Sequence, residues 1–327
     1  MIAPLYRPDE IENGLDMDAT VLVVGHGSIG SRHVRNLLTL GPGVVVVDSD
    51  PERRSEVPAD LRTYSTIGAA LLAEKPTHAI IATPAQHRSN PMGLLRNVPR
   101  LMIEKPLFVS FGVASEDSMS PVGRFVGYNL RFLPSLRAFR DQVRTAPLGR
   151  ILWARVECSS YAPDWRTGRP YASTPSAWKA QGGGALRECS HEVDMVRWIF
   201  GQPTVRTVVV ERTHSLVGDS DDYALAVLQT PHCERVELHL DLVRRDARRR
   251  IEVICERGTL VWEHMPIGLI NIDGGRQQIS GRDNIGATYI DEVKALLSDV
   301  IPEWADPNIA TLEDGLREQH GPSIETD

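Results

Sequence analysis

The tripeptide Glu-Lys-Pro occurs twice in the chain, and the two copies stand in different surroundings. Glu74–Lys75–Pro76 closes the helix-like stretch TIGAALLA, whereas Glu104–Lys105–Pro106 directly follows the apolar run RLMI. A lysine in the last turn of a helix, followed by proline, is a common helix-stop signal. A lysine at the carboxyl end of a buried strand lies where parallel sheets bind ligands. Lys105 is therefore the candidate for chemistry, since it could polarise a substrate oxygen and exchange a proton.

A second group of reactive side chains lies in the segment GGGALRECSHEVDMVRWIFG, residues 182–201. Three consecutive glycines indicate a backbone that bends or closely approaches another group. The residues after them have helical spacing, which predicts Glu188 and His191 on one helix face. His191 is a candidate acid or base, although a lone histidine on a helix is more often structural. Asp194 is expected to be a structural partner, and the choice of acid/base between Lys105 and His191 stays open.

The loop PDWRTGRPY, residues 163–171, interleaves aromatic and basic side chains. Aromatic faces can stack on sugar rings, and guanidinium groups hold phosphate or carboxylate groups. Trp165 and Arg166 are therefore candidate substrate ligands. An irregular surface loop would explain the same pattern equally well.

A glycine-rich turn precedes these residues and predicts the element that positions a cofactor. In TVLVVGHGSIGSRHVRNLL, a β-branched run is followed by Gly25, Gly27 and Gly30, and then by apolar residues at helical spacing. A strand, a G-x-G-x-x-G turn and a helix in this order form the dinucleotide-binding turn. Its helix N-terminus favours the negatively charged pyrophosphate.

The choice between NAD and NADP depends on Asp48, which ends the next predicted strand, GVVVVD. A carboxylate at this position binds the adenosine ribose hydroxyls and repels a 2′-phosphate. We therefore expect NAD, with NADP the less favoured cofactor. Arg53 and Arg54 follow closely and could attract a phosphate. An ordinary turn residue is the alternative reading of Asp48.

The remaining pattern predicts a two-domain α/β protein. Short apolar runs at 78–84, 100–106 and 124–130 indicate further strands of a buried parallel sheet. From residue 131 a helix, 134–145, leads to runs that predict a mostly antiparallel sheet, at 151–161, 205–213, 223–230, 235–243, 250–255 and 258–263. We expect an N-terminal tail (1–18), a doubly wound Rossmann domain (19–130) and an α+β domain (131–327) with a large open sheet.

Composition excludes several classes of protein. The net charge of −7 and the mixed composition argue against a nucleic-acid or anionic-membrane partner. No apolar run approaches the ~20 residues of a membrane span, and the acidic N-terminus is unlike a signal peptide. A cytoplasmic protein is expected. The four scattered cysteines show no metal-ligand spacing, so reduced thiols and no metal are expected.

In motif order and spacing the chain resembles the Gfo/Idh/MocA family of nicotinamide-dependent sugar and cyclitol oxidoreductases. The resemblance runs from about residue 19 to 318 and rests on GHGSIGSRHVRNL, IIATPAQH, EKPL, GYNLRF, GGGALRECSHEVD and RRRIEVICERGTLVWE. It implies a Rossmann domain followed by an α+β domain whose open sheet forms the subunit interface. A homodimer or homotetramer is therefore expected.

The resemblance also implies the roles of individual residues. Lys105 and His191 would carry the proton chemistry. The substrate would be bound by Asn129, Arg131, Trp165, Arg166 and Glu188. The cofactor would be bound by Gly25, Gly27, Ser28, Ile29, Gly30, Asp48, Thr83, Pro84, His87, Glu104 and Lys105.

The sequence departs from the family pattern in three places. Many members have Asp four residues before the histidine, where this chain has Arg187 and the acid is Glu188. The segment VSFGVASEDSMSPVG replaces a full amphipathic helix, and EQHGPSIETD replaces the usual C-terminal helix.

The function expected is hydride transfer between nicotinamide and a secondary alcohol or ketone of a sugar, amino sugar, nucleotide sugar or cyclitol, in a carbohydrate biosynthetic pathway. The alternative is a non-catalytic NAD-binding sensor on the same fold. An enzyme that uses NAD transiently, as in redox-assisted glycoside cleavage, is a further alternative. The substrate, the oxidised carbon, the direction and the oligomer size stay open.

Overall fold

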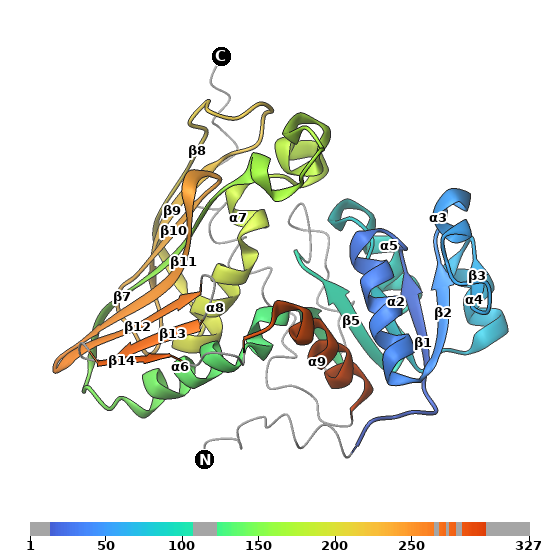
Figure 1. The fold of residues 1–327 in the computed structure, drawn as a ribbon, viewed down its shortest axis with the longest axis horizontal. Coiled ribbons are helices and arrows are strands. Elements are labelled where there is room, and N and C mark those ends of the chain that lie inside the picture. Colours follow the sequence, from blue (N-terminus) through green and yellow to red (C-terminus); the bar gives the residue numbers. More distant parts are fainter. Residues whose placement is uncertain (1–13, 107–122, 265–267, 273–274, 279–282, 299–327) are drawn as a thin grey trace. The chain divides into compact units, whose positions relative to one another are not determined.

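The computed structural model describes residues 14–106, 123–264, 268–272, 275–278 and 283–298. The chain divides into two compact units, Met1–Asn129 with Ile285–Asn308, and Leu130–Asn284 with Ile309–Asp327. The expected tail up to residue 13, the segment 107–122 and the chain beyond 298 lie outside the described residues. Each unit is described separately below (Figure 1).

The first unit contains a six-stranded parallel sheet, as the apolar runs predict. Its strand order is β3-β2-β1-β4-β5-β6. The order of strands across the sheet runs one way from β1 to β3 and the other way from β4 to β6, so the topological switch point lies between β1 and β4. The strands are β1 (Thr20–Val24), β2 (Gly43–Val47), β3 (Arg62–Tyr64), β4 (His78–Ile81), β5 (Arg100–Glu104) and β6 (Arg124–Gly127). The helices between them are α2 (Ser28–Leu40), α3 (Pro51–Ser55), α4 (Ile67–Glu74) and α5 (Ser89–Leu94), with the short 3₁₀ helix η1 (Ala85–His87) before α5.

The central strands are buried on both faces, which explains their continuous apolar sequence. Leu22, Val23, Ile80 and Ile81 are fully buried. Parallel strands covered by helices on both sides have this character. The doubly wound fold expected from the sequence is therefore confirmed for this unit.

Helix α4 ends where the first Glu-Lys-Pro tripeptide predicts a helix stop. Thr66 caps its N-terminus, where Ala69 N–H donates to Thr66 Oγ1 at 3.3 Å. Lys75 lies at the C-cap with φ of +47°, a left-handed conformation that helix ends commonly adopt. The Lys75 side chain is exposed. It therefore belongs to the end of a helix, not to a ligand site.

A helix from late in the sequence completes the first unit. Helix α9 (Ile285–Leu297) packs against α2 and β5, and Leu15 forms a β-bridge with Ser298. Its residues Val293, Leu296 and Leu297 are almost fully buried. The expected domain 131–327 therefore needs correction, because the apolar face of α9 is covered within the nucleotide-binding unit.

The second unit contains an eight-stranded sheet of order β14-β13-β12-β11-β7-β10-β9-β8. Every neighbouring pair is antiparallel except β10 and β7, so the expected mostly antiparallel sheet is confirmed. The strands are β7 (Ile151–Tyr161), β8 (Thr204–Glu211), β9 (Tyr223–Gln229), β10 (Val236–Asp241), β11 (Val243–Cys255), β12 (Gly258–His264), β13 (Gly268–Ile272) and β14 (Gly275–Gln278). Strands β13 and β14 were not predicted.

One face of this sheet is covered by helices α6 (Pro134–Thr145), α7 (Ala185–Glu188) and α8 (Ser190–Phe200) (Figure 1). Its core contains Leu136, Phe139 and Phe200, all fully buried. The indole of the buried Trp262 donates to Ser135 Oγ at 2.8 Å, which ties β12 to the start of α6.

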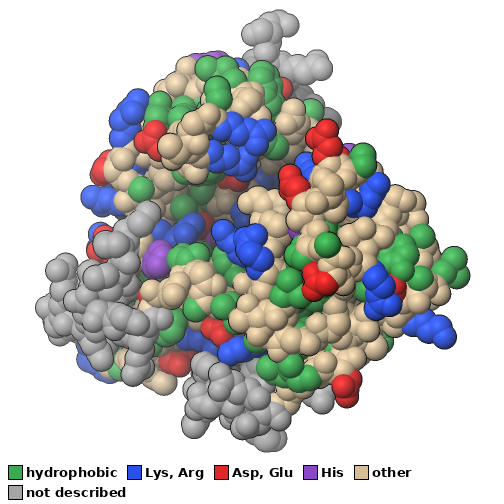
Figure 2. Space-filling model, turned by 45° about the vertical axis from the view of Figure 1, so that its right-hand side comes forward, with side chains coloured by type: hydrophobic (Ala, Val, Ile, Leu, Met, Phe, Trp, Pro, Cys, Tyr) green, Lys and Arg blue, Asp and Glu red, His purple; other side chains and the backbone are tan. Residues whose placement is uncertain are grey.

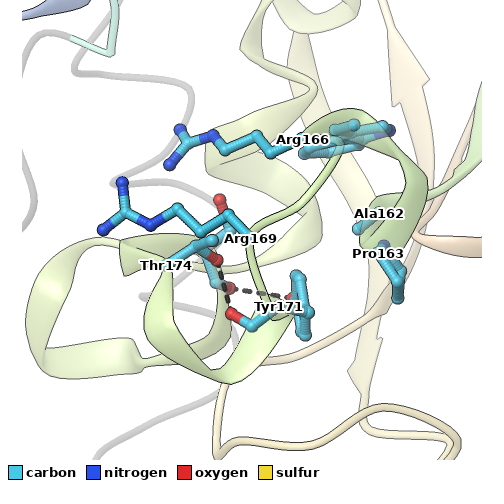
Figure 3. Close-up of a pocket in the computed structure, with 8 residues that line it drawn as sticks. Ala162, Pro163, Arg166, Arg169, Tyr171 and Thr174 are labelled. Carbon is cyan, nitrogen blue, oxygen red and sulfur yellow. Dashed lines mark hydrogen bonds between the residues drawn. The ribbon is translucent and has the colours of Figure 1, made fainter.

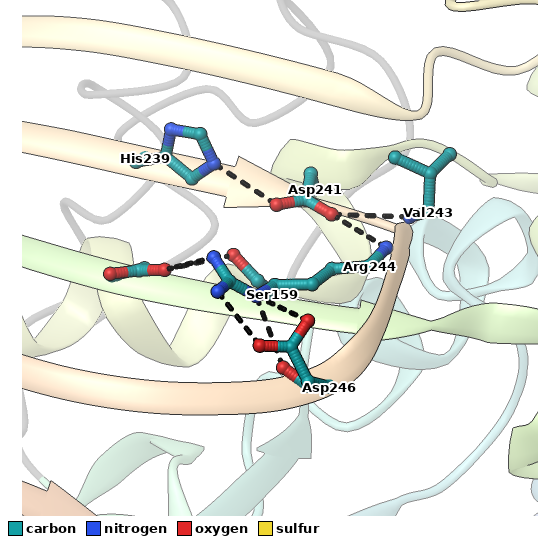
Figure 4. A network of polar contacts seen from close by, with 7 residues as sticks. Ser159, His239, Asp241, Val243, Arg244 and Asp246 are labelled. Carbon is teal, nitrogen blue, oxygen red and sulfur yellow. Dashed lines mark hydrogen bonds and ion pairs between the residues drawn. The ribbon is translucent and has the colours of Figure 1, made fainter.

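The other face of the sheet carries polar side chains in pairs. Arg155 and Glu237 form an ion pair with a 2.6 Å contact across β7 and β10. Figure 4 shows a network near the ends of these strands, in which Arg244 contacts Asp246 and a carboxylate of β7, that of Glu157. The basic run RRDARRR thus forms part of strand β11 and is partly neutralised by acidic neighbours.

The charges on the surface are mixed. On the face that Figure 2 shows, basic and acidic side chains are interspersed, with small hydrophobic groups between them. Within the described residues, no helix combines the length and the apolar character that a membrane crossing requires.

Candidate cofactor and substrate sites

The turn between β1 and α2 requires glycine at two of its three glycine positions. Gly25 has φ of +96°, and a Cβ there would lie 3.0 Å from the backbone of Ala82 and Thr83. A Cβ on Gly30 would lie 1.8 Å from the carbonyl oxygen of Gly25. Helix and strand therefore pack in direct backbone contact, as the glycine spacing predicts.

The same turn leaves space for a ligand. The nearest described atom to a Cβ on Gly27 would be Arg53 Nη1 at 3.8 Å, so the backbone is open on that side. Helix α2 begins after Gly27 without a side-chain cap, which leaves the N–H groups around Ser28 and Ile29 available to an anion. The buried Thr83 Oγ1 has no hydrogen-bond partner among the described residues. These features fit the pyrophosphate and ribose of a dinucleotide.

Asp48 is fixed beside this turn. The backbone N–H of His26 donates to Asp48 Oδ2 at 2.7 Å, and the N–H of Asp50 donates to Oδ1 at 2.9 Å. Arg53 Nη1 lies 3.9 Å from Asp48 Oδ2, while Arg54 donates to the Asp48 carbonyl at 2.6 Å. The carboxylate therefore lies where the sequence predicts it, and Arg53 is the basic neighbour of its side chain.

Lys105 follows β5 in a segment that one buried arginine holds in place. Arg88 Nε donates to the carbonyl of Thr83 at 2.9 Å, and its Nη1 donates to the carbonyls of Glu104 and Pro106. Burial lowers the pKa of Arg88 to about 10, so it remains charged near neutral pH. Lys105 itself is half-buried. Arg88 thus joins the segment after β4 to the end of β5.

Glu104, which is predicted to contact the cofactor, also makes contacts within the protein. Its side chain is 5% exposed; Oε1 lies 2.6 Å from His33 Nε2, and the Lys105 N–H donates to Oε2 at 3.2 Å. The other predicted cofactor residues, Pro84 and His87, are exposed on and before η1.

In the second unit the three glycines bring the backbone close to two acceptors. A Cβ on Gly183 would lie 2.3 Å from the Ser176 carbonyl, and one on Gly184 would lie 2.6 Å from Asp221 Oδ1. Asp221 Oδ2 accepts from Ala185 N–H at 2.8 Å at the start of α7. The acidic turn GDSDD, residues 218–222, therefore anchors the segment that carries His191.

Glu188 and His191 do not share one continuous helix, contrary to the prediction. Cys189 separates α7 from α8 with φ of −94° and ψ of +32°. The helix breaks because α7 is a single turn fixed by Asp221, whereas α8 packs against the sheet. His191 lies in the first turn of α8 and is 9% exposed, while Glu188 is half-buried.

Arg131, which is predicted to bind substrate, forms an ion pair with Asp194. Its Nε lies 2.7 Å from Asp194 Oδ2, and Nη2 contacts Oδ1, in a buried two-point ion pair. Asp194 is thus the structural partner that the sequence predicts. Asn129 also has a structural contact, since its Nδ2 donates to Thr288 Oγ1 at 2.8 Å on α9.

Trp165 and Arg166 line a small pocket together with Tyr171 and Arg169. Figure 3 shows the Arg166 and Arg169 side chains extending in the same direction from the loop. Arg169 donates to the carbonyl of Ser173 at 3.0 Å, and the Tyr171 hydroxyl donates to that of Ser176 at 3.0 Å. The empty space between these side chains, about 200 Å³, includes open solvent, so this is a shallow surface pocket.

Sequence reasoning missed a buried pair beside His191. Arg249 Nε lies 2.6 Å from Oε1 of Glu192, which is fully buried on α8. The neighbouring Cys189 lies close to Cys158, and contact with this thiol and burial raise the pKa of Cys189 well above its usual value. Cys189 is therefore a protonated, packed thiol, as expected.

The glycine turn, the acid after β2 and the lysine after β5 define a dinucleotide-dependent oxidoreductase. Residues 19–117 match the oxidoreductase family with an NAD-binding Rossmann fold, and residues 136–261 match the GFO/IDH/MocA C-terminal domain. Together these matches cover more than half of the chain. The chain belongs to the GFO/IDH/MocA family, and its first unit is an NAD-binding domain.

Comparisons with individual proteins agree with this assignment. The rhizopine catabolism protein MocA of Rhizobium meliloti is 29% identical over 61% of this chain, a match that covers 64% of MocA. Myo-inositol dehydrogenase Hyg17 of Streptomyces leeuwenhoekii is 26% identical over 90% of this chain and 92% of its own length. The structure of a levoglucosan dehydrogenase with NADH and levoglucosan has the same fold, with a TM-score of 0.78, 18% identity, and coverage of 92% of this chain and 96% of that one.

Proposed function

We propose that the protein transfers a hydride between NAD(H) and a secondary alcohol or ketone of a sugar, amino sugar, nucleotide sugar or cyclitol, in carbohydrate biosynthesis. The observation that carries this proposal is the position of Lys105. It follows β5 of an NAD-binding sheet, and Arg88 links its backbone to Thr83, next to the open glycine turn. Related proteins that act on inositol and levoglucosan support a polyhydroxylated substrate.

Individual residues of the chain would have the following roles in binding and catalysis. When bound, NAD supplies the hydride acceptor or donor. The uncapped N-terminus of α2 and the open Gly27 backbone bind its pyrophosphate, and Asp48 binds the adenosine ribose. Thr83 and Pro84 would hold the nicotinamide ribose. Lys105 polarises the substrate oxygen, and either Lys105 or His191 moves the hydroxyl proton.

The substrate half of the site would come from the second unit. Glu188 orients His191 or binds a hydroxyl group, and Trp165 stacks on a ring. The Arg166 side chain has no hydrogen bond or ion pair within the described residues, which leaves its guanidinium available to a phosphate or carboxylate. A nucleotide sugar or a sugar acid would use this group, whereas a neutral cyclitol would not.

A second copy of the chain is proposed to cover the polar face of the second unit's sheet. That face includes half-buried apolar side chains, Leu225 and Val227 on β9, between the ion pairs. A dimer or tetramer would bury them. Light scattering at micromolar concentration tests this, and a monomer would contradict it.

Turnover with a panel of substrates tests the function. The purified protein would be titrated with NAD and then with sugars, cyclitols, sugar acids and nucleotide sugars while NADH fluorescence is followed. Net NADH formation with one of these compounds is expected. NAD binding without turnover of any member would favour the sensor, and a steady reduced fraction without net conversion would favour transient use of NAD.

A further inference from the structure

Three ionisable side chains meet in the core of the first unit, behind the strand end that carries Lys105. They are His33 on α2, Glu104 at the end of β5 and Glu292 on α9, and the nearest atoms of the three lie within 4.8 Å of one another. All three are buried, with exposures of 0%, 5% and 0%. Neither carboxylate oxygen of Glu292 has a hydrogen-bond partner among the described residues. A fully buried, unpartnered acid is costly, so it needs an explanation.

A glycine of β6 makes room for the two acids. A Cβ on Gly127 would lie 3.1 Å from Glu292 Oε1 and 3.5 Å from Glu104 Oε1. Both carboxyl groups therefore occupy the space above the same glycine. Two carboxylates this close in a dry core cannot both be ionised without a large cost, so one of them carries a proton.

The charges around the two acids decide which one is protonated. Burial opposes the ionisation of Glu104, but the hydrogen bond from His33 and the charges of His33, Arg88 and Lys105 lower its pKa. Burial and the neighbouring Glu104 raise the pKa of Glu292 well above its usual value. The remaining polar groups facing the cluster are Tyr289, Arg32 over its ring, and Tyr128 near Arg88. Glu104 is thus ionised, and Glu292 is protonated.

A metal ion does not explain the cluster. Zinc ligands about 2.0–2.2 Å from the ion would lie roughly 3.3 Å from one another in a tetrahedral site. His33 Nε2 and Glu104 Oε1 are 2.6 Å apart, which is the distance of a hydrogen bond.

We propose that Glu292 is a positioning residue for Lys105: Glu292 carries the proton, and Glu104 therefore stays ionised next to the backbone of the lysine. Glu104 connects the cluster to the lysine, because its Oε2 accepts the Lys105 N–H. If Glu292 were ionised, a second negative charge would compete for His33 and Arg88. The role of Lys105 itself rests on the proposed function, whereas the proton on Glu292 does not.

The first experiment measures that proton without using activity. The unfolding equilibrium of the full chain would be compared with that of Glu292→Gln between pH 5 and 8. Because the folded pKa is raised, the unfolded state loses its proton first, at about pH 4.3. As the pH rises, the free energy of unfolding of the wild type should then fall relative to that of the variant. The folding equilibrium constant should change by up to tenfold per pH unit until the pH exceeds the folded pKa. Parallel curves, or stoichiometric zinc in the purified protein, would overturn the proposal.

The second experiment measures positioning through the reactivity of Lys105. An amine-acylating reagent would be applied over a pH series, with peptide mass spectrometry to quantify Lys105 and the exposed Lys75 as an internal control. Glu104→Gln should change the acylation rate of Lys105 relative to that of Lys75 severalfold, because the segment that carries Lys105 loses the carboxylate that accepts its backbone N–H. Glu292→Gln should leave this rate within about twofold of wild type, as should the control Asp291→Asn on the same helix.

A matched pair of variants separates polarity from packing at this position. Glu292→Leu fills the same space without a polar group, and it should alter the reactivity of Lys105 and lower turnover about tenfold, whereas Glu292→Gln should restore both. Equal behaviour of the Leu and Gln variants would overturn the positioning role. So would a change in the acylation rate of Lys105 in Glu292→Gln as large as that in Glu104→Gln. If no substrate is turned over by the wild type, the stability and acylation results still decide the inference, and only the proposed function fails.

Discussion

Arg131 and Asp194 form a two-point ion pair inside the second unit, with Arg131 Nε 2.7 Å from Asp194 Oδ2. Both side chains are at most 5% exposed, and the Arg131 guanidinium also lies 5.5 Å from the centre of the Trp198 ring. The pair joins the segment after β6 to helix α8, which carries His191. It is therefore a structural link, with consequences for stability.

Removing one member of this pair should be strongly destabilising. Arg131→Met leaves the Asp194 carboxylate buried without its partner, and we expect a loss of about 3–5 kcal/mol in the free energy of unfolding. The double variant Arg131→Met/Asp194→Leu should recover much of this loss, because no buried charge remains. Chemical denaturation of the three proteins provides the measurement, and a stable single variant would show that water reaches the carboxylate.

The two Glu-Lys-Pro lysines should differ sharply in turnover. Lys105→Ala should retain folding and NAD affinity but lose roughly 10²–10⁴-fold in turnover, the usual effect of one proton-transfer group. Lys75→Ala is the matched control, with the same neighbours in sequence but an exposed position at the end of α4. Lys105→Arg should not restore activity, since a guanidinium stays protonated. Steady-state rates with separately measured NAD affinity test this, and equal losses in both alanine variants would contradict it.

Replacing Lys75 by glycine should affect the stability of the protein and not its turnover. Its φ of +47° is a conformation that glycine adopts without a steric penalty. Lys75→Gly should therefore be neutral or stabilising, by up to about 1 kcal/mol. Thermal unfolding of the Gly and Ala variants at equal protein concentration makes the comparison. A glycine variant less stable than the alanine variant would show that the left-handed cap is not kept in solution.

Cofactor preference should depend on Asp48. We expect the wild type to bind NAD more tightly than NADP, because the fixed carboxylate repels a 2′-phosphate. Asp48→Ala should narrow the difference, with Arg53, 3.9 Å from Asp48 Oδ2, then free to attract the phosphate. Fluorescence titration with NADH and NADPH measures both affinities. Preference of the wild type for NADPH would contradict the electrostatic argument.

Asp241 should make stability depend on pH in the acidic range. Burial alone would raise its pKa, but hydrogen bonds from His239, Ser159 and the Val243 N–H lower it (Figure 4). Because its pKa is lower in the folded state, ionised Asp241 stabilises the protein at pH values above the pKa of the unfolded state, about 3.9. This stabilisation is lost as the pH falls through the folded pKa. Asp241→Asn should therefore cost stability at pH 6 and little at pH 3. A difference from wild type that does not change with pH would mean that the charge of Asp241 is not responsible.

The strands and helices of each unit could be predicted from short stretches of sequence, because burial and turn geometry leave their pattern within each stretch. Buried parallel strands have continuous apolar runs, and the glycine turn has a fixed spacing, so β1, β2 and β4 and the position of Lys105 followed directly. Helix α9 could not be assigned to the first unit, because an apolar helical face does not say which distant surface covers it. For example, His33 on α2 lies beside Glu292 on α9, although 259 residues of sequence separate them.

The candidate site was predictable in its residue types but less so in their partners. Asp48 and the glycines lie where the sequence places them. Arg131 is predicted to bind substrate, and the structure pairs it with Asp194, a side chain 63 residues away. Likewise, nothing local to Glu104 reveals that His33 and Glu292 enclose it. Such contacts depend on tertiary packing, which sequence spacing alone does not encode.

The return of α9 to the first unit has a consequence for the order in which the protein can be made. The nucleotide-binding unit is discontinuous, since residues 130–284 of the second unit are inserted between its β6 and α9. A ribosome therefore releases Glu292 only after residues 130–284 of the second unit have been synthesised. Until then the cluster behind Lys105 lacks its third member and the buried surface of α2 lacks its cover. The surroundings of Glu104 and Lys105 are therefore completed late in synthesis, although both residues lie in the first third of the chain.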